Sequence, residues 1–329
     1  MRVGVSSRLA KISLSNFYKK DINEIEELWH AFDPPYKELI EWLQGITKKP
    51  NVNDRPVFRS PMLANPLEEI DYKIINPNNY LAEWKWDGIR IQLVSLNQSV
   101  KLYSRTGDDI SKTFPEITSL KLNQNFSLDG ELMAGEINRP GTFNDLQQRL
   151  NRKSPSKEII KTVPTFIIAY DILFLQSSDI RQKKITERRK ILFQFLNKEN
   201  MPFIKFSEEV KFKDFNELEQ KRLKCREELN YEGLMLKLKN SIYQPGRPKG
   251  PWYKFKRDPF NVDVVLLYAQ RGHGKRSSLY SDYTFGVWQK NSLNEELVTV
   301  GKAYSGFTDK DLIKLDKFIR TNTINKVGH

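Results

Sequence analysis

The sequence predicts an α+β protein that begins with helices, continues as a larger mixed body and ends in a smaller β-rich part. Three patterns lead to this prediction: helical spacing of apolar residues up to about residue 48, strand-like and helix-like runs over 56–259, and further strands after 260. With 329 residues, 39% of them hydrophobic, the chain is long enough for two or three domains with a sizeable core.

The first part, residues 1–55, is expected to be a small helical unit followed by a linker. Ile22, Ile25 and Leu28 are spaced as on one face of a helix. The polar stretch 48–56 has a proline near each end and is typical of a linker.

The second part, residues 56–259, is expected to combine antiparallel sheets with flanking helices. Its predicted elements include strands at 89–94, 100–103 and 165–173 and helices at 187–196 and 214–229. The strand at 165–173 is a continuous apolar run, which indicates burial on both faces.

The third part, residues 260–329, is expected to hold a partial barrel. Strand patterns occur at 262–270, 283–289 and 297–303, and Thr308–Asp311 has capping-box spacing ahead of a helix. Three strands and then a helix match the first part of a five-stranded OB barrel. Because the chain ends at His329, where two more strands would be due, the barrel is expected to be incomplete.

Composition limits the classes of function. The chain has 54 Lys+Arg and 41 Asp+Glu, a net charge of +13, which favours a polyanion such as nucleic acid, although a generally basic soluble protein is the alternative. One cysteine, Cys225, excludes a disulfide framework and a thiolate zinc site and fits a cytoplasmic protein. No apolar run is long enough to span a bilayer, so no membrane partner is expected.

Lys85 is the main candidate for chemistry. It lies between Trp84 and Trp86 and is followed by Asp87-Gly88. An ordinary lysine has a pKa of about 10.4, so a lysine nucleophile needs burial or neighbouring cations to lower that pKa. The alternative is a hairpin turn that carries surface charges.

Further polar residues follow Lys85 in an ordered series. Arg105 follows a predicted strand, Glu131 and Glu232 each adjoin a glycine, and Tyr170 lies within the apolar run. Lys254 and Lys256 alternate with aromatic residues, so on a strand they share one face. Taken singly, the acids could form surface salt bridges, Tyr170 could be a core residue, and the two lysines could be an exposed strand face.

As an ordered set over residues 83–256, these motifs resemble the covalent lysine nucleotidyltransferases, which include ATP-dependent DNA ligases, RNA ligases and mRNA capping enzymes. The helical stretch after Arg2–Val5 is similar to the end of the helical DNA-binding domain in larger DNA ligases, which favours the bacterial and archaeal ATP-dependent type. The resemblance implies an ATP-grasp-like nucleotidyltransferase domain over 56–259, an OB-fold domain over 260–329 and a remnant of a DNA-binding domain over 1–55.

The resemblance also implies residue roles. Lys85 would attack the α-phosphorus of ATP and hold AMP as a phosphoramidate. The implied nucleotide contacts are adenine selection by Glu83, adenine stacking by Tyr170, ribose and phosphate contacts by Arg90 and Arg105 (with the nick 5′-phosphate as an alternative for Arg105), α-phosphate contacts by Lys254 and Lys256, and a nucleotide contact by Arg247. Glu131 would meet the ribose or a metal, and Glu131 and Glu232 would bind Mg²⁺.

A monomer that seals nicks in double-stranded DNA, and so forms phosphodiester bonds, is therefore the expected function. RNA ligation and GTP-dependent capping remain alternatives with the same chemistry. The basic motif that relatives carry near the end of the OB domain is not found in the sequence. A truncated nick-binding fragment that is impaired in self-adenylation is therefore the third alternative.

Overall fold

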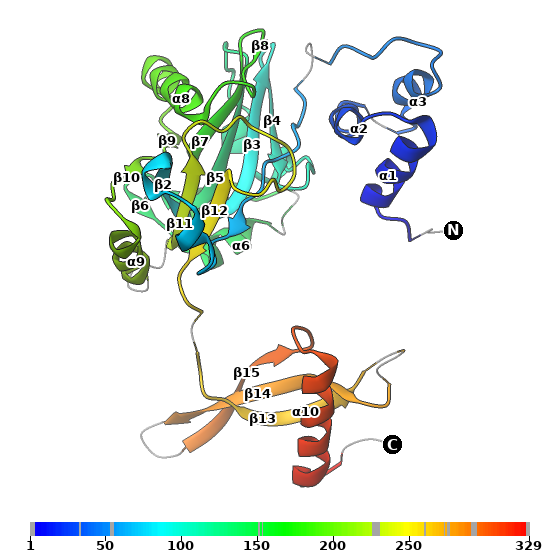
Figure 1. Ribbon diagram of the computed structural model, residues 1–329, viewed down its shortest axis with the longest axis vertical. Coiled ribbons are helices and arrows are strands. Elements are labelled where there is room, and N and C mark those ends of the chain that lie inside the picture. The colour runs from blue at the N-terminus through cyan, green and yellow to red at the C-terminus, as the bar shows by residue number, and fades with distance from the viewer. Residues whose placement is uncertain are drawn as a thin grey trace. The chain divides into compact units, whose positions relative to one another are not determined.

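The computed structural model divides into two compact units, Met1–Arg257 and Asp258–His329 (Figure 1). The structure describes residues 4–32, 34–52, 56–150, 152, 154–225, 231–259, 261–272, 274, 277–290 and 295–326. Within these ranges, no helix is both long enough and apolar enough to cross a bilayer.

The larger unit begins with helices, as predicted. They are α1 (Ser7–Tyr18), α2 (Ile22–Trp29) and α3 (Lys37–Leu43). Side-chain caps explain two of the starts, because Ser6 accepts a hydrogen bond from the backbone N–H of Leu9 and Asp21 from that of Asn23. Their apolar faces share a buried core of Ile25, Leu28, Leu39, Trp42 and Leu43.

The rest of the larger unit is built on two mainly antiparallel sheets. The first has the strand order β1 (Asn65–Pro66), β12 (Trp252–Lys256), β11 (Tyr231–Leu238), β2 (Tyr80–Trp86), β10 (Glu209–Val210). The second has the order β4 (Ser99–Ser104), β3 (Ile89–Leu96), β5 (Phe126–Glu136), β7 (Thr165–Leu175), β8 (Ser178–Asp179), with β6 (Arg139–Pro140) beside β5 and β9 (Ile204–Phe206) beside β7. The predicted strand pair is confirmed, since β3 and β4 are antiparallel neighbours.

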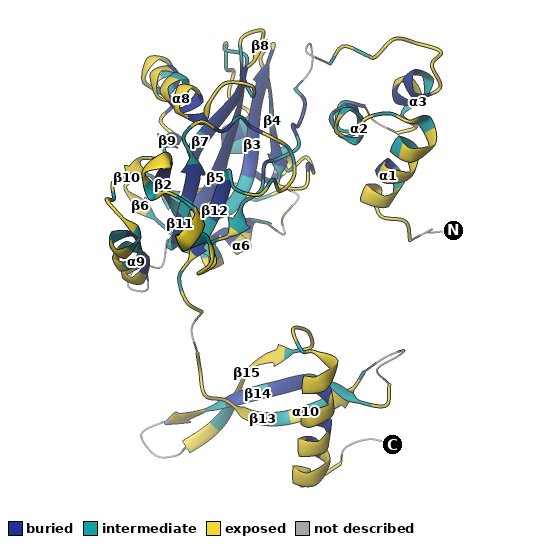
Figure 2. Ribbon diagram, viewed as in Figure 1, coloured by how far each residue is buried: buried dark blue, intermediate teal, exposed yellow. Residues whose placement is uncertain are grey.

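The main apolar core lies against the second sheet. Figure 2 shows its strands as largely buried. The helices that contribute are α5 (Pro115–Thr118), α6 (Phe143–Leu150) and α8 (Ile185–Glu199). Ile167 and Ile172 of β7 are fully buried, as the apolar run predicted, and Leu192 of α8 is buried with them. Short helices α4 (Asp71–Ile74), α7 (Lys157–Thr162) and α9 (Phe215–Lys224) complete this unit; the end of the predicted helix 214–229 lies outside the described residues.

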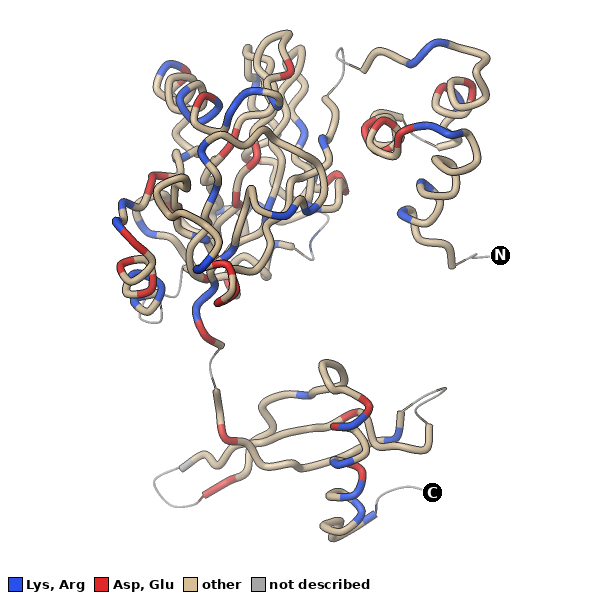
Figure 3. The backbone as a smooth tube through the Cα atoms, in the orientation of Figure 1, with Lys and Arg blue, Asp and Glu red and all other residues tan. Residues whose placement is uncertain are grey.

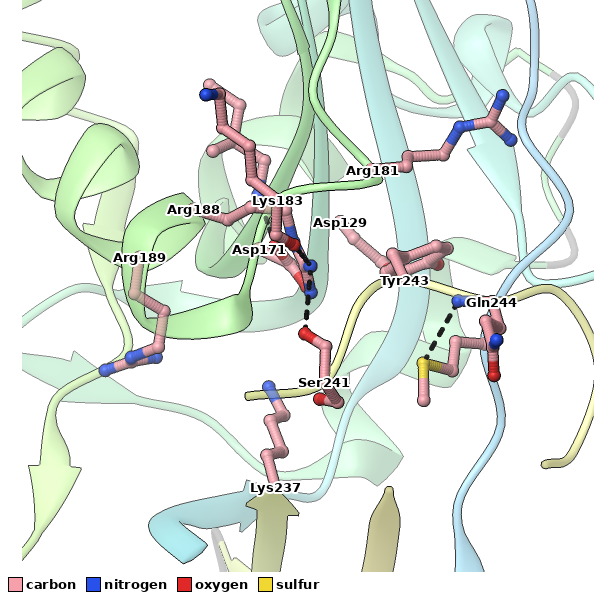
Figure 4. Close-up of polar contacts among 12 residues, drawn as sticks. Asp129, Asp171, Arg181, Lys183, Arg188, Arg189, Lys237, Ser241, Tyr243 and Gln244 are labelled. Atoms are coloured by element: carbon pink, nitrogen blue, oxygen red, sulfur yellow. Dashed lines mark hydrogen bonds and ion pairs between the residues drawn. The ribbon is translucent and has the colours of Figure 1, made fainter. Parts of the chain in front are cut away.

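A buried ion pair fastens α8 to the second sheet (Figure 4). Asp171 of β7 accepts hydrogen bonds from the Arg188 guanidinium at 2.8 Å on each carboxylate oxygen, and both side chains are fully buried. Arg188 also donates to the carbonyl oxygen of Lys183 at 2.5 Å. A charge removed from water in this way depends on its partner for compensation.

The turn Asp87-Gly88 is not a hairpin turn, so that alternative is wrong. Strand β2 pairs with β11 and β10 in the first sheet, whereas β3 pairs with β4 and β5 in the second. The turn therefore carries the chain from one sheet to the other directly after Lys85. A Cβ atom at Gly88 would clash with the backbone oxygen of Leu132, so the close approach requires glycine.

The smaller unit contains the predicted strands and helix. Strands β13 (Val265–Arg271), β14 (Tyr280–Lys290) and β15 (Glu295–Ala303) form an antiparallel sheet, and α10 (Asp309–Asn322) follows. Thr308 and Asp311 make the predicted capping box, and Leu312 and Ile319 of α10 pack with Tyr283 of β14. This arrangement confirms the expected first part of an OB fold.

Candidate active site

All ten predicted site residues line one cavity of about 550 Å³ in the larger unit. They come from β2, β3, β5, β7, β11 and β12 and from two loops. The residues are Glu83, Lys85, Arg90, Arg105, Glu131, Tyr170, Glu232, Arg247, Lys254 and Lys256. Another cavity, of about 320 Å³ and lined by residues 120–124 and 199–203, contains none of them.

Lys85 lies inside this cavity and is bound to Glu232. Its Nζ is 2.8 Å from Glu232 Oε2, and Lys256 Nζ is 2.7 Å from the same oxygen. The Lys85 side chain is 22% exposed, so it is not a free surface charge. Burial raises the pKa of Glu232, but Lys85 and Lys256 outweigh burial and lower that pKa to about 2. Glu232 is therefore an anion held between two lysines.

A β-bulge places Glu232 there. Gly233 of β11 pairs with Lys85 of β2 on one side and with Lys256 of β12 on the other. Tyr231 pairs with Trp86, the residue after Lys85, so Glu232 is the additional residue of the bulge. Since Gly233 lies between the two lysines, the adjoining carboxylate can reach both amines.

Gly233 is expected not to tolerate alanine. Its φ is +138°, a conformation that favours glycine, and a Cβ atom would lie 2.7 Å from the Lys256 Cα. We expect Gly233→Ala to lower the free energy of unfolding by about 1 to 3 kcal/mol and to separate Glu232 from the lysines. Urea denaturation measures the first effect, and Gly301→Ala, with open space around its Cβ position, is the control. A Gly233→Ala protein as stable as Gly301→Ala would contradict this account of the bulge.

Glu131 is another carboxylate of the cavity. Burial raises its pKa to about 7, although Lys85 and Arg90 act in the opposite direction. Among the described residues, no cluster of three or more His, Cys, Asp or Glu could hold a metal. The carboxylates of Glu131 and Glu232 nevertheless supply the oxygen ligands that Mg²⁺ takes, and Mg²⁺ usually keeps several waters and needs few protein ligands.

Glu83 is almost completely buried, at 1% exposure. Lys237 Nζ is 2.8 Å from its Oε2, and Arg189 of α8 pairs with its Oε1. Lys237 Nζ also lies 4.4 Å from the centroid of the Tyr170 ring. Both carboxylate oxygens of Glu83 are thus bound by cations. To select adenine, Glu83 would have to act through Lys237 or lose its contact with Lys237.

The prediction from sequence did not include Lys237 and Arg189 among the site residues. Lys237 had a usable signal, because Leu234 and Leu236 of β11 alternate with Met235 and Lys237. That alternation separates a core face from the cavity face, on which Met235 and Lys237 lie. Arg189 had none, because it is 106 residues from Glu83 and meets it only through the packing of α8.

Asp129 joins Arg90 to the predicted stacking residue Tyr170. The Arg90 guanidinium donates to both Asp129 carboxylate oxygens, at 3.0 and 2.6 Å, and to the Met62 carbonyl oxygen at 2.6 Å. The hydroxyl groups of Tyr170 and Tyr243 donate to the same carboxylate at 3.1 and 2.6 Å. The predicted ribose and phosphate contacts of Arg90 would have to compete with these bonds, which instead hold Arg90 and Tyr170 in place.

Four further cations lie around Lys254. Burial lowers its pKa, and Arg247, Lys256, Lys85 and Arg105 lower it further. Arg247 and Arg105 come from loops, yet both line the cavity with Lys254 of β12. Such a concentration of positive charge favours a polyanionic ligand such as a nucleoside triphosphate.

The cavity therefore combines the Lys85 amine, three carboxylates, a group of cations and the Tyr170 ring. This set suits the transfer of a nucleotidyl group to an amine, because such a transfer needs charge neutralisation around phosphorus and an oriented leaving group.

Comparisons with known proteins agree with this reading. Residues 61–256 match the family model described as "ATP dependent DNA ligase domain". A "Probable DNA ligase" of Koribacter versatilis is 33% identical over 80% of this chain and 49% of its own length. A "DNA ligase" of Methanococcus aeolicus is 29% identical over the whole of this chain and 59% of its own length. The chain thus spans about half to three fifths of these relatives.

Solved structures resemble the fold. A structure from an analysis of Lig E DNA ligases matches 78% of this chain and 88% of its own, with a TM-score of 0.56 and 19% identity. A mycobacterial DNA ligase D complexed with ATP and MES matches 80% and 77%, with a TM-score of 0.50 and 21% identity. At these identities the likeness concerns the fold, which is the predicted nucleotidyltransferase domain followed by OB-fold strands.

Proposed function

This chain belongs to the ATP-dependent DNA ligase domain family, and from that premise we propose that it seals nicks in duplex DNA through a lysine–AMP intermediate. The observation that carries the proposal is Lys85, whose amine is held by Glu232 in a cavity lined by Lys254, Arg247 and Arg105. We further propose that the protein acts as a monomer in the cytoplasm.

In the first step, Lys85 Nζ attacks the α-phosphorus of ATP. A nitrogen–phosphorus bond forms, the bond from that phosphorus to the pyrophosphate oxygen breaks, and the amine gives up protons. Lys254, Lys256 and Arg247 line the cavity and would balance the charge of the phosphates, and the Tyr170 ring would stack on the adenine. Mg²⁺ held at Glu131 and Glu232 would add charge neutralisation and orient the leaving group.

In the following steps, AMP passes to the 5′-phosphate at a nick, and the 3′-hydroxyl then attacks that phosphate and releases AMP. The net charge of +13 supports a DNA partner, and Lys and Arg residues are distributed over both compact units (Figure 3). Arg105 lies on a loop at the cavity and is our candidate for the nick phosphate.

Radiolabelled nucleotide tests the proposal directly. The protein is incubated with α-labelled ATP or GTP and Mg²⁺, precipitated with acid and counted, and then supplied with nicked DNA or nicked RNA. We expect acid-precipitable label from ATP, its loss on addition of nicked DNA, and a sealed strand. Preference for GTP or for RNA would favour the capping or RNA-ligase alternatives, and nick binding without label would favour a non-catalytic fragment.

A further inference from the structure

Three aromatic side chains form a continuous row of ring contacts on the strands that carry Lys85 and Glu232. The Tyr231 ring centroid lies 4.7 Å from that of Trp84, with planes 26° apart, and 4.7 Å from that of Trp86, with planes 58° apart. We call Trp84, Tyr231 and Trp86 the aromatic ladder. Such ring pairs each contribute about 0.5 to 1.5 kcal/mol beyond their area burial.

The aromatic ladder includes both sequence neighbours of Lys85. Trp84 and Trp86 flank Lys85 on β2, and all three residues line the same cavity. Tyr231 directly precedes Glu232, the additional residue of the bulge. The ladder thus ties the backbone on both sides of Lys85 to the residue that enters the bulge.

The two ends of the ladder are embedded in different apolar clusters. Trp84 packs against the cluster of the first sheet, which includes Leu234 and Phe255. Trp86 packs against Met133, Phe166 and Ile168, which belong to β5 and β7 of the second sheet. The ladder therefore spans from one sheet to the other at the point where the chain crosses between them, and Tyr231 is its central ring.

We propose that Tyr231 is a positioning residue for the attack of Lys85. Its ring keeps the bulge in register, so that Glu232 Oε2 stays 2.8 Å from Lys85 Nζ and 2.7 Å from Lys256 Nζ. Tyr231 touches no reacting atom in this role; it acts through Glu232. The expected effect on rate rests on the proposed adenylation of Lys85. The contact between Lys85 and Glu232 can be tested even if Lys85 is not adenylated.

The kinetic test compares wild type, Tyr231→Leu and Tyr231→Phe. Because loss of about 1 Å in alignment can cost about 100-fold in rate, we expect Tyr231→Leu to slow single-turnover AMP attachment about 10- to 100-fold. Tyr231→Leu should also need a higher Mg²⁺ concentration for the half-maximal rate. The Kd of a non-hydrolysable ATP analogue should stay within about threefold of the wild-type value. Tyr231→Phe keeps the ring and should retain the rate. Tyr36→Leu is the matched control, because it removes a stacked pair with Trp29 (4.5 Å, 28°) in the N-terminal helices.

A second measurement does not depend on catalysis. Trinitrobenzenesulfonate modifies free amines, and mass spectrometry reports the rate at Lys85. Loosening of the Lys85–Glu232 pair in Tyr231→Leu should raise that rate several-fold, whereas Tyr231→Phe and Tyr36→Leu should leave it unchanged.

The outcomes separate this inference from the proposed function. Wild type that takes no label from ATP contradicts the proposed function, and the amine modification then decides the positioning role alone. The inference is overturned if the wild type is labelled and Tyr231→Leu behaves like it in three respects: the rate of AMP attachment, its Mg²⁺ dependence and the reactivity of Lys85. If Tyr231→Leu does not fold, Trp84→Leu removes the partner ring instead, and wild-type behaviour in that variant overturns the inference equally.

Discussion

Lys85→Ala is expected to abolish attachment of AMP to the protein, with the single-turnover rate reduced by at least about 10⁴-fold. The reason is chemical, because this variant lacks the nitrogen that forms the bond to phosphorus, and removal of a nucleophile has effects of this order. Lys85 Nζ is the amine paired with Glu232 in the cavity, and Lys256 already shares that carboxylate. Acid-precipitable label from α-labelled ATP and the added mass of AMP on the intact chain are the two measurements.

Two variants separate the nucleophile from its charge. Lys85→Arg keeps a cation beside Glu232 but should remain unlabelled, because a guanidinium stays protonated and is a poor nucleophile. Lys37→Ala removes a lysine whose side chain is 77% exposed and should be labelled like the wild type. Label that persists in Lys85→Ala would show that another residue accepts AMP and would contradict the assignment.

Asp171→Ala is expected to lower the free energy of unfolding by about 3 to 5 kcal/mol, the usual cost of leaving one member of a buried ion pair without its partner. Asp171 and Arg188 are both fully buried, and their two hydrogen bonds of 2.8 Å join β7 to α8. Without Asp171, the Arg188 guanidinium would keep backbone carbonyl acceptors but lose its counter-charge. Urea denaturation followed by circular dichroism measures the change.

A paired replacement tests the cause of that loss. Asp171→Leu combined with Arg188→Met removes both charges and should recover most of the lost stability, since apolar residues can replace a buried pair. Lys211→Ala breaks an exposed pair with Glu209 and should cost less than about 1 kcal/mol. A cost for Asp171→Ala as small as that for Lys211→Ala would show that Arg188 finds compensation elsewhere.

Prediction from sequence worked where the information is local. The apolar run at 165–173 became β7, Thr308 and Asp311 capped α10, and the alternation at Lys254 and Lys256 placed both on one strand in the cavity. In each case neighbouring residues determine the outcome, through side-chain periodicity or a single turn of hydrogen bonds.

Prediction failed where partners are distant in sequence. The local sequence could not exclude a hairpin turn at Asp87-Gly88. Only the pairing of β2 and β3 with different strands excluded it. Lys237 reaches Glu83 across 154 residues and Arg189 across 106, and no period in the sequence relates them. The role of Asp129 is likewise visible only in the folded structure, where Arg90 and Tyr170 both donate hydrogen bonds to its carboxylate.

The identity of the groups that can react was therefore already present in the chain: the amine of Lys85, the carboxylates of Glu131 and Glu232, and the basic residues of β12. Side-chain chemistry and local order suffice for that, because they do not depend on folding. The environment of each group came from the packed sheets. A bulge at Glu232 and buried cations at Glu83 arise from contacts between distant strands and helices, and these contacts determine which charges are paired before any substrate arrives.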